Sequence, residues 1–460
     1  MNGEEFLKLL ISPANVLISF LVLLIIIAYT MFNANSIDDL EERRDYKRNV
    51  YHKLFFSGLF AVYYIGIFKG GDTYAYFCTM EVLQNLMFSD FEKYLTIVND
   101  PPSMEYYLGY FDFKIGYPPR FIYMEEESFN VAKFLLPFHI ITFNSYLGLT
   151  FLLAFIMSIA NWKIYKIAKA SGIFQKTLLK IFVLYLPSVA FWCSGISKDM
   201  LVYTSILFCV YYIYSILRLK PSFIKKVQYV VGLLIFSYII YRTRPFILYP
   251  LLVPILLMGV SGIINRIKSF PFLRMIIKGG VYVIMLVGIV IGLSLITANN
   301  LLESSESFTE AVIVQQDFKN NTGVYGADDS KRYDLGISDY SPAGIIRVAP
   351  LTILTGIYRP FIWESLSLSL IFNGLESLFY LFMTFWFFFV KFRTRLSAFQ
   401  TNELLSFAIG FVFVFAFIAG FTSILFGVLV RIRAPLLPFL GMLLSIDYKL
   451  YLKSLVPSTN

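Results

Sequence analysis

Long apolar runs separated by short polar connections dominate the chain. A helix that crosses a membrane needs about 20 mostly apolar residues, and about eleven runs approach that length. We interpret the first run, residues 13–32, as a retained helix, because no small-residue cleavage site of a secretory signal follows it. The other runs lie near residues 54–68, 146–162, 178–195, 200–217, 227–241, 245–263, 279–297, 371–390, 404–422 and 434–448. The pattern predicts an all-α polytopic membrane protein with a single integral membrane domain, residues 1–460.

The composition supports this class. Hydrophobic residues make up 58% of the chain and charged residues 15%, and the mean hydropathy is +0.69. A soluble domain has roughly 45–50% apolar and about 25% charged residues, so this excess cannot be hidden in ordinary globular cores. A soluble enzyme is excluded. The 3 cysteines and 2 histidines are too few for a disulfide framework or a histidine-rich metal centre.

The positive charge orients the predicted helices. More than half of the 39 Lys and Arg residues fall in the short connections around residues 43–53, 163–180, 218–226, 266–278, 391–395 and 449–453. Short loops rich in Lys and Arg stay in the cytoplasm, so the N-terminus is predicted outside and the C-terminus inside. We expect a bacterial inner (cytoplasmic) membrane. Two long segments then lie outside, residues 69–145 and 298–370, and we expect short helices and the functional site in them.

Four predicted outer turns carry cations at helix ends. Such cations can bind lipid headgroups, and Lys198 can pair with its neighbour Asp199. The positive-inside rule, however, should make cations scarce on this side. Arg binds phosphate oxygens in a planar, bidentate manner, and Lys acts beside it as a point charge. We therefore predict that these turns bind the phosphate of a lipid, and not nucleic acid, through Lys198, Arg242, Arg244, Arg359, Arg431 and Arg433.

Two carboxylates are candidate catalytic groups. Asp72 follows Gly70 and Gly71 at the predicted outer membrane boundary, where it could act as a base or hold a divalent cation. The alternative is that it caps a helix. Glu364 is the second candidate, although an ion pair with Arg359 explains it more simply.

Other residues near these turns receive a simpler interpretation. The run Glu125–Glu127 is expected to be a solvated helix start, and His139 a packed side chain. Aromatic rings can stack on sugars, although Tyr and Trp are also common at membrane interfaces. The candidates for sugar binding are Tyr74, Trp192 and Trp363.

The order of these motifs resembles bacterial multi-pass glycosyltransferases of the GT-C superfamily and the polymerases of surface-polysaccharide clusters. The motifs are an Asp after an early span, a long outer loop, W-x-S-G-x-x-K-D at 192–199, R-P at 244–245 and R-x-R-x-P-x-x-P at 431–438. The resemblance implies a GT-C-like fold, a catalytic acid or base at Asp72 and a sugar donor on polyprenyl phosphate or diphosphate. Many members carry paired acidic residues in that loop, whereas Asp72 has no acidic neighbour.

The predicted function is therefore transfer of a sugar from a polyprenyl-linked donor at the outer face of the membrane, in cell-surface glycan assembly. The partners are polyprenyl-linked sugars or oligosaccharides and membrane lipids. No cofactor is required by the sequence, and a role for Mg²⁺ or Mn²⁺ stays open. Two alternatives also stay open: an O-antigen-type polymerase or ligase, and a lipid-oligosaccharide flippase or transporter. The apparent scarcity of charges within the helices argues against transport.

Overall fold

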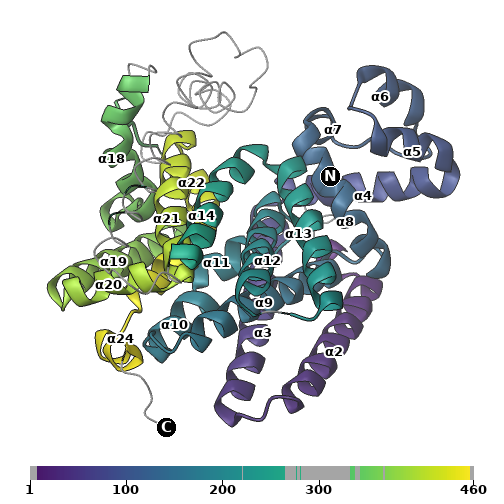
Figure 1. Ribbon diagram of the computed structural model, residues 1–460. Coiled ribbons are helices and arrows are strands. Elements are labelled where there is room, and N and C mark those ends of the chain that lie inside the picture. Colours follow the sequence, from purple (N-terminus) through teal and green to yellow (C-terminus); the bar gives the residue numbers. More distant parts are fainter. Residues whose placement is uncertain are drawn as a thin grey trace. The chain divides into compact units, whose positions relative to one another are not determined.

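The computed structural model describes residues 8–219, 221–264, 276, 280, 332–336, 342–365 and 368–455. Every named element within these residues is a helix, which confirms the predicted all-α class (Figure 1). Nine described helical segments are long and apolar enough to cross a membrane, so the chain is a polytopic membrane protein. They are Pro13–Asn35, Leu40–Ile67, Tyr146–Ala170, Lys198–Arg218, Phe223–Thr243, Pro245–Gly262, Leu370–Phe389, Glu403–Thr422 and Phe426–Leu444.

The run at 178–195 does not form the single helix that its apolar composition predicts. Instead, α10 (Lys176–Leu184) ends before Tyr185, and α11 (Pro187–Trp192) begins at a proline. Proline disfavours the helical conformation of the residue before it and is well tolerated at the first position of a helix. The predicted run at 279–297 and most of the outer segment 298–370 lie outside the described residues.

The described helices form two compact units. The first unit comprises Met1–Lys163, Val189–Cys209 and Gly232–Arg244. In it, α2 (Pro13–Asn35) packs against α3 (Leu40–Ala61), which continues as the π-helical turn η1 (Val62–Ile67). The unit also takes in parts of α9 (Tyr146–Ala170), α12 (Lys198–Arg218) and α13 (Phe223–Thr243).

The predicted first outer segment is a folded part of this unit. It contains α4 (Asp72–Ser89), α5 (Phe91–Asn99), α6 (Met104–Tyr110), α7 (Arg120–Met124) and α8 (Glu126–Ile141). α4 packs along α8 and buries Phe77 and Leu83 against Phe129 and Leu135 in one apolar core. The same core reaches Tyr146 at the start of α9, so the loop helices are held against the end of a spanning helix.

The second unit comprises Ile164–Ser188, Val210–Val231 and Pro245–Asn460. Its centre is α21 (Glu403–Thr422), which packs against α14 (Pro245–Ile264) and α18 (Pro342–Tyr358). Glycines allow α18 and α21 to approach closely, because a Cβ at Gly356 or at Gly420 would overlap the facing backbone. The other elements are η4 (Ile362–Glu364), α19 (Leu368–Phe389), α20 (Phe392–Thr401), α22 (Phe426–Ile432), η5 (Ala434–Leu436), α23 (Leu437–Leu444) and α24 (Tyr448–Leu455).

Two connections of the second unit that are predicted to be cytoplasmic meet at one end of it. The Gln175 amide donates to the Ser445 carbonyl at 2.8 Å, and Phe174 forms a β-bridge with Ile446. The two connections therefore share a side, as their positive charges predict.

Candidate functional site

Asp72 lies exposed in the first turn of α4, shortly after the spanning segment Leu40–Ile67 ends. The turn before it depends on Gly71, whose φ of 81° favours glycine. A Cβ at Gly71 would lie 3.2 Å from the Phe68 ring and 3.3 Å from the Tyr64 ring, so the position has little room for a side chain. Asp72 is not among the ion-paired residues of the described chain. It is therefore a carboxylate open to solvent at a predicted membrane boundary.

Lys198 and Arg242 both contact the glutamates that begin α8. Lys198 Nζ lies 2.9 Å from a Glu125 carboxylate oxygen and 3.4 Å from one of Glu127. Arg242 lies 2.7 Å from Glu126. As expected, Glu125–Glu127 lie at the start of a helix, and the Glu125 and Glu126 side chains are 56% and 49% exposed. The same carboxylates also form ion pairs with Lys198 and Arg242, two of the predicted phosphate ligands.

Arg244 is the partner of Asp199, at 2.6 Å. The pair is largely enclosed, with 14% of the Arg244 side chain and 9% of the Asp199 side chain exposed. The simple expectation that Lys198 pairs with Asp199 is therefore not met: Lys198 reaches the glutamates of α8 instead. These contacts hold three predicted outer segments together in the first unit.

A hydrogen-bonded path leads from the Asp72 helix into this cluster. Tyr76, one turn after Asp72, lies 3.4 Å from the Ser128 hydroxyl, which donates to Glu125 at 2.8 Å. Burial raises the pKa of Tyr76, and the nearby carboxylates of Asp72, Glu125 and Asp199 raise it further. Tyr76 is therefore a neutral hydrogen-bonding group between the exposed carboxylate and the paired charges.

Glu125 keeps its charge in this setting. Burial acts to raise its pKa, but the Lys198 ammonium, the Ser128 hydroxyl and the Arg244 guanidinium together lower it below the usual value. Glu125 is therefore an ionised carboxylate at neutral pH, beside the Lys198 side chain.

Asn130 holds Arg242 in place. Its amide nitrogen donates to the Arg242 carbonyl at 3.0 Å, and its amide oxygen accepts from the Arg242 guanidinium at 3.3 Å. Asn130 is 3% exposed, so the end of α13 is pinned to the first turns of α8. Sequence reasoning missed this residue, because a single Asn carries no signal before the fold brings α8 and α13 together.

Arg359 and Glu364 form a pair in the second unit. The Arg359 Nε donates to the two Glu364 carboxylate oxygens at 3.0 and 3.1 Å, and Glu364 also accepts from the Phe361 amide at 2.9 Å. The guanidinium lies over the rings of Tyr333 and Phe426, at 4.8 and 5.3 Å from their centres. Glu364 is therefore occupied by structural contacts, as the simpler account of it expects.

Arg433 is 1% exposed and occupied by its own unit. Its guanidinium donates to the carbonyls of Ile357 and Arg359 and to the Ser377 hydroxyl. Arg431 is half-buried, and its Nε donates to the Gly427 carbonyl at 3.2 Å. Arg359 and Arg433 thus meet in the second unit, but Arg433 presents no free face to a ligand.

The predicted sugar-binding aromatics differ in exposure. Trp192 is 7% exposed and packs edge-to-face against Phe191, which leaves no ring face for a sugar. Tyr74 is half-buried on α4, two residues after Asp72. Trp363 is 68% exposed and stacks on Phe361 in the second unit. Tyr74 is the one of these rings that lies beside Asp72.

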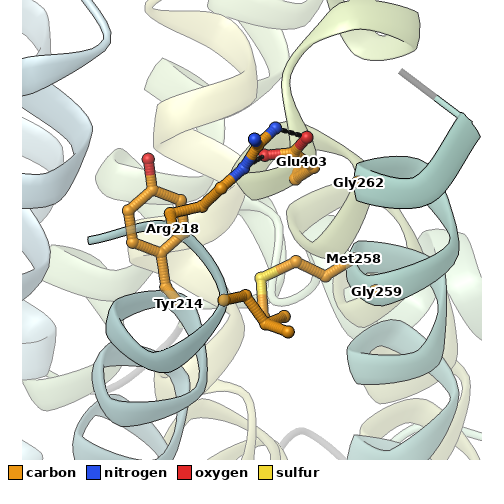
Figure 2. Close-up of a pocket in the computed structure, with 7 residues that line it drawn as sticks. Tyr214, Arg218, Met258, Gly259, Gly262 and Glu403 are labelled. Atoms are coloured by element: carbon orange, nitrogen blue, oxygen red, sulfur yellow. Dashed lines mark hydrogen bonds and ion pairs between the residues drawn. The ribbon is translucent and has the colours of Figure 1, made fainter. Parts of the chain in front are cut away.

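A small cavity of about 120 Å³ lies in the second unit, between α12, α14 and α21 (Figure 2). Its polar wall is an ion pair between Arg218 and Glu403, which Figure 2 shows side by side. The remaining lining residues are Tyr214, Leu217, Met258, Gly259 and Gly262. The cavity is too small for a sugar, and none of the predicted site residues lines it.

The structure thus brings the predicted cations together in two groups, Lys198 with Arg242 and Arg244, and Arg359 with Arg433. Within the described ranges, no group of three or more His, Cys, Asp or Glu residues is placed to hold a metal ion. Comparison with known proteins found no family model, no curated protein and no solved structure that matches the chain.

Proposed function

We propose that the protein transfers a sugar from a polyprenyl-phosphate-linked or polyprenyl-diphosphate-linked donor at the outer face of a bacterial inner membrane. The reaction would contribute to cell-surface glycan assembly. The observation that carries the proposal is the cluster of the first unit, in which the helix of the exposed Asp72 is linked through Tyr76 and Ser128 to Glu125 and its paired cation Lys198.

The cations can exchange partners at small cost. The Glu125 and Glu126 side chains are 56% and 49% exposed, and exposed ion pairs contribute only about 0–1 kcal/mol each. A phosphate that approaches Lys198 or Arg242 can therefore displace these glutamates into water. Arg244 stays enclosed with Asp199 behind the exchangeable pairs and is not displaced.

The chemistry needs a base and a stabilised leaving group. An acceptor hydroxyl attacks the anomeric carbon of the donor, its proton passes to the Asp72 carboxylate, and the bond from that carbon to the phosphate oxygen breaks. The departing polyprenyl phosphate takes the electron pair and is stabilised by Lys198 and Arg242. Tyr74, on the same helix as Asp72, is placed to contact the sugar. No step of this proposal requires Mg²⁺ or Mn²⁺.

The test is Asp72→Asn in the purified full-length chain, with Asp38→Asn as the control because Asp38 is exposed and outside the cluster. Release of polyprenyl phosphate from a panel of polyprenyl-phosphoryl hexoses measures transfer. We expect Asp72→Asn to lower the rate by at least the 10²-fold typical of a lost base, with unchanged thermal stability. Full activity in Asp72→Asn would remove Asp72 as the base.

A polysaccharide polymerase or ligase is the second candidate, and it would depend on arginines such as Arg359 more than on Asp72. This Arg is half-buried, lies over two aromatic rings and adjoins the buried Arg433. In a polymerase that depends on it, Arg359→Gln should abolish extension of a lipid-linked oligosaccharide while Asp72→Asn leaves extension intact. The opposite pattern would favour the transferase.

A further inference from the structure

The spanning helix α3 turns its polar side inward. Asp45, Asn49, Lys53 and Ser57 recur every fourth residue, so they share one face, and their exposures are 4%, 0%, 0% and 0%. The opposite face is apolar and exposed, with Phe55 at 62% and with Tyr51, Leu59 and Val62 beside it. In a membrane this places the apolar face against lipid and the polar face inside the protein.

Other polar groups of the first unit are buried in the same helices. Asn49 donates to the Ser158 carbonyl of α9 at 2.9 Å, and Asn161 of α9 donates to the Tyr203 hydroxyl of α12 at 2.7 Å. Lys53 lies near the buried thiol of Cys193, which in turn lies near Tyr203. We call this set the polar seam: Asp45, Asn49, Lys53, Ser57, Ser158, Asn161, Cys193 and Tyr203.

The seam extends towards both ends of the unit. From Asp45 to Ser57 the helix rises about 18 Å, at 1.5 Å per residue. Beside Asp45, Arg44 and Arg48 are exposed. At the other end, Cys193 lies near the ion pair of Asp199 and Arg244.

Burial of so many polar and charged groups in a membrane-spanning unit costs free energy, which suggests that the polar seam has a function. A buried cation within a membrane span is rare and usually marks an ion or proton pathway. The buried polar atoms of the unit that have no hydrogen-bond partner among the described residues include Asn49 Oδ1 and Thr204 Oγ1. Buried polar atoms in such surroundings are commonly satisfied by internal water. The charge pattern of the sequence counts Lys53 with the loop cations; the structure instead buries it within α3.

We propose that the polar seam is a hydrated proton pathway through the first unit, with Lys53 as the group that carries the proton. The Lys53 ammonium releases a proton to water on one side, its N–H electron pair stays on nitrogen, and the free amine accepts the next proton from the other side. Proton movement of this kind is a function in addition to sugar transfer, and it does not rest on the roles proposed for Asp72 or the outer cations.

Proton flux into vesicles tests the pathway. The full-length chain is reconstituted in vesicles that contain a pH-sensitive dye, and a potassium diffusion potential drives protons inward. We expect vesicles with the wild-type chain to acidify faster than protein-free vesicles. Vesicles with Lys53→Met or Lys53→Arg should acidify only at the rate of protein-free vesicles. Arg keeps the buried charge but cannot release a proton, so it separates proton transfer from a merely structural charge. Lys176→Met, at an exposed position, is the control and should conduct as the wild type does.

Two outcomes of this assay would overturn the proposal: wild-type flux no faster than that of protein-free vesicles, or wild-type flux in Lys53→Arg. A measurement on the unaltered chain supports it independently of mutant folding. Hydroxyl radicals formed from bound water by X-ray pulses should oxidise Cys193 several-fold faster than Cys209. Both thiols are buried, but Cys209 contacts Ser237 outside the seam. Equal oxidation rates would contradict a hydrated seam.

Discussion

The proposed binding of a donor phosphate at Arg242 requires that the phosphate displace Glu126, so removal of the Glu126 charge should tighten phosphate binding. In the first unit Arg242 contacts Glu126 at 2.7 Å, and 27% of the Arg242 side chain and 49% of the Glu126 side chain are exposed. Glu126→Gln leaves the shape of the side chain nearly unchanged and removes its charge. Arg242 stays in position because Asn130 holds its backbone carbonyl.

The size of the effect follows from the exposure of the pair. A partly exposed ion pair contributes about 0.2–1 kcal/mol, and the ligand no longer has to break it in the variant. Because RT is about 0.6 kcal/mol, the Kd for a phosphate ligand should fall by a factor of about 1.4 to 5. A larger change would require the cluster to rearrange, since Lys198 keeps its own two glutamates.

Farnesyl phosphate is the probe, and its Kd is measured by thermophoresis of the detergent-solubilised chain. Glu92→Gln is the matched control, because Glu92 is an exposed glutamate on α5 outside the cluster. In the Arg242→Gln background, Glu126→Gln should give no gain, as a double-mutant cycle requires. The proposed displacement of Glu126 from Arg242 would be refuted if Glu126→Gln bound farnesyl phosphate more weakly than the wild type. It would also be refuted if Glu126→Gln gave the same gain in affinity in the Arg242→Gln background.

Three further predictions concern stability. Burial lowers the pKa of His139 to about 4, so the folded state favours the neutral imidazole. The free energy of unfolding is therefore highest above the unfolded-state pKa near 6.5 and falls by about 3 kcal/mol as the pH drops towards 4. Thermal unfolding of His139→Leu should not show this loss. Gly195→Ala should destabilise by about 1–3 kcal/mol, seen as a lower Tm, since a Cβ would overlap the Phe60 ring; an unchanged Tm would contradict this close packing. Arg433→Met should cost about 3–5 kcal/mol in denaturant unfolding, because the partners of the buried guanidinium lose their donors, whereas a ligand-binding role alone would leave stability unchanged.

The apolar pattern alone determined the class of the protein and most of its helices. Runs such as 146–162 and 404–422 are too long and too uniformly apolar for barrel strands, and in lipid a single run of this length satisfies its own backbone only as a helix. The same pattern could not locate the helix break before Pro187, because an apolar run has the same composition whether it forms one long helix or two short ones. Its position depends on local backbone chemistry.

Only part of the candidate site could be predicted from the sequence. Asp72 and the cations of the turns predicted to lie outside are visible in the sequence, because charge is unexpected at those positions. Their partners are not, since Glu125 and Lys198 lie far apart in the chain and meet only when α8 packs beside α12. Nothing in the sequence distinguishes these glutamates from the exposed Glu92 or Glu105.

The buried face of α3 shows what only the tertiary structure decided. In the sequence, Lys53 is one of several cations that follow Arg43, and charge counting assigns it to a loop. The spacing of Asp45, Asn49, Lys53 and Ser57 puts them on one face of a helix, but spacing does not say whether that face meets water, lipid or protein. The packing of α3 in the first unit shows that this face contacts protein. Burial depends on which helices cover a face, and here those helices come from distant parts of the chain.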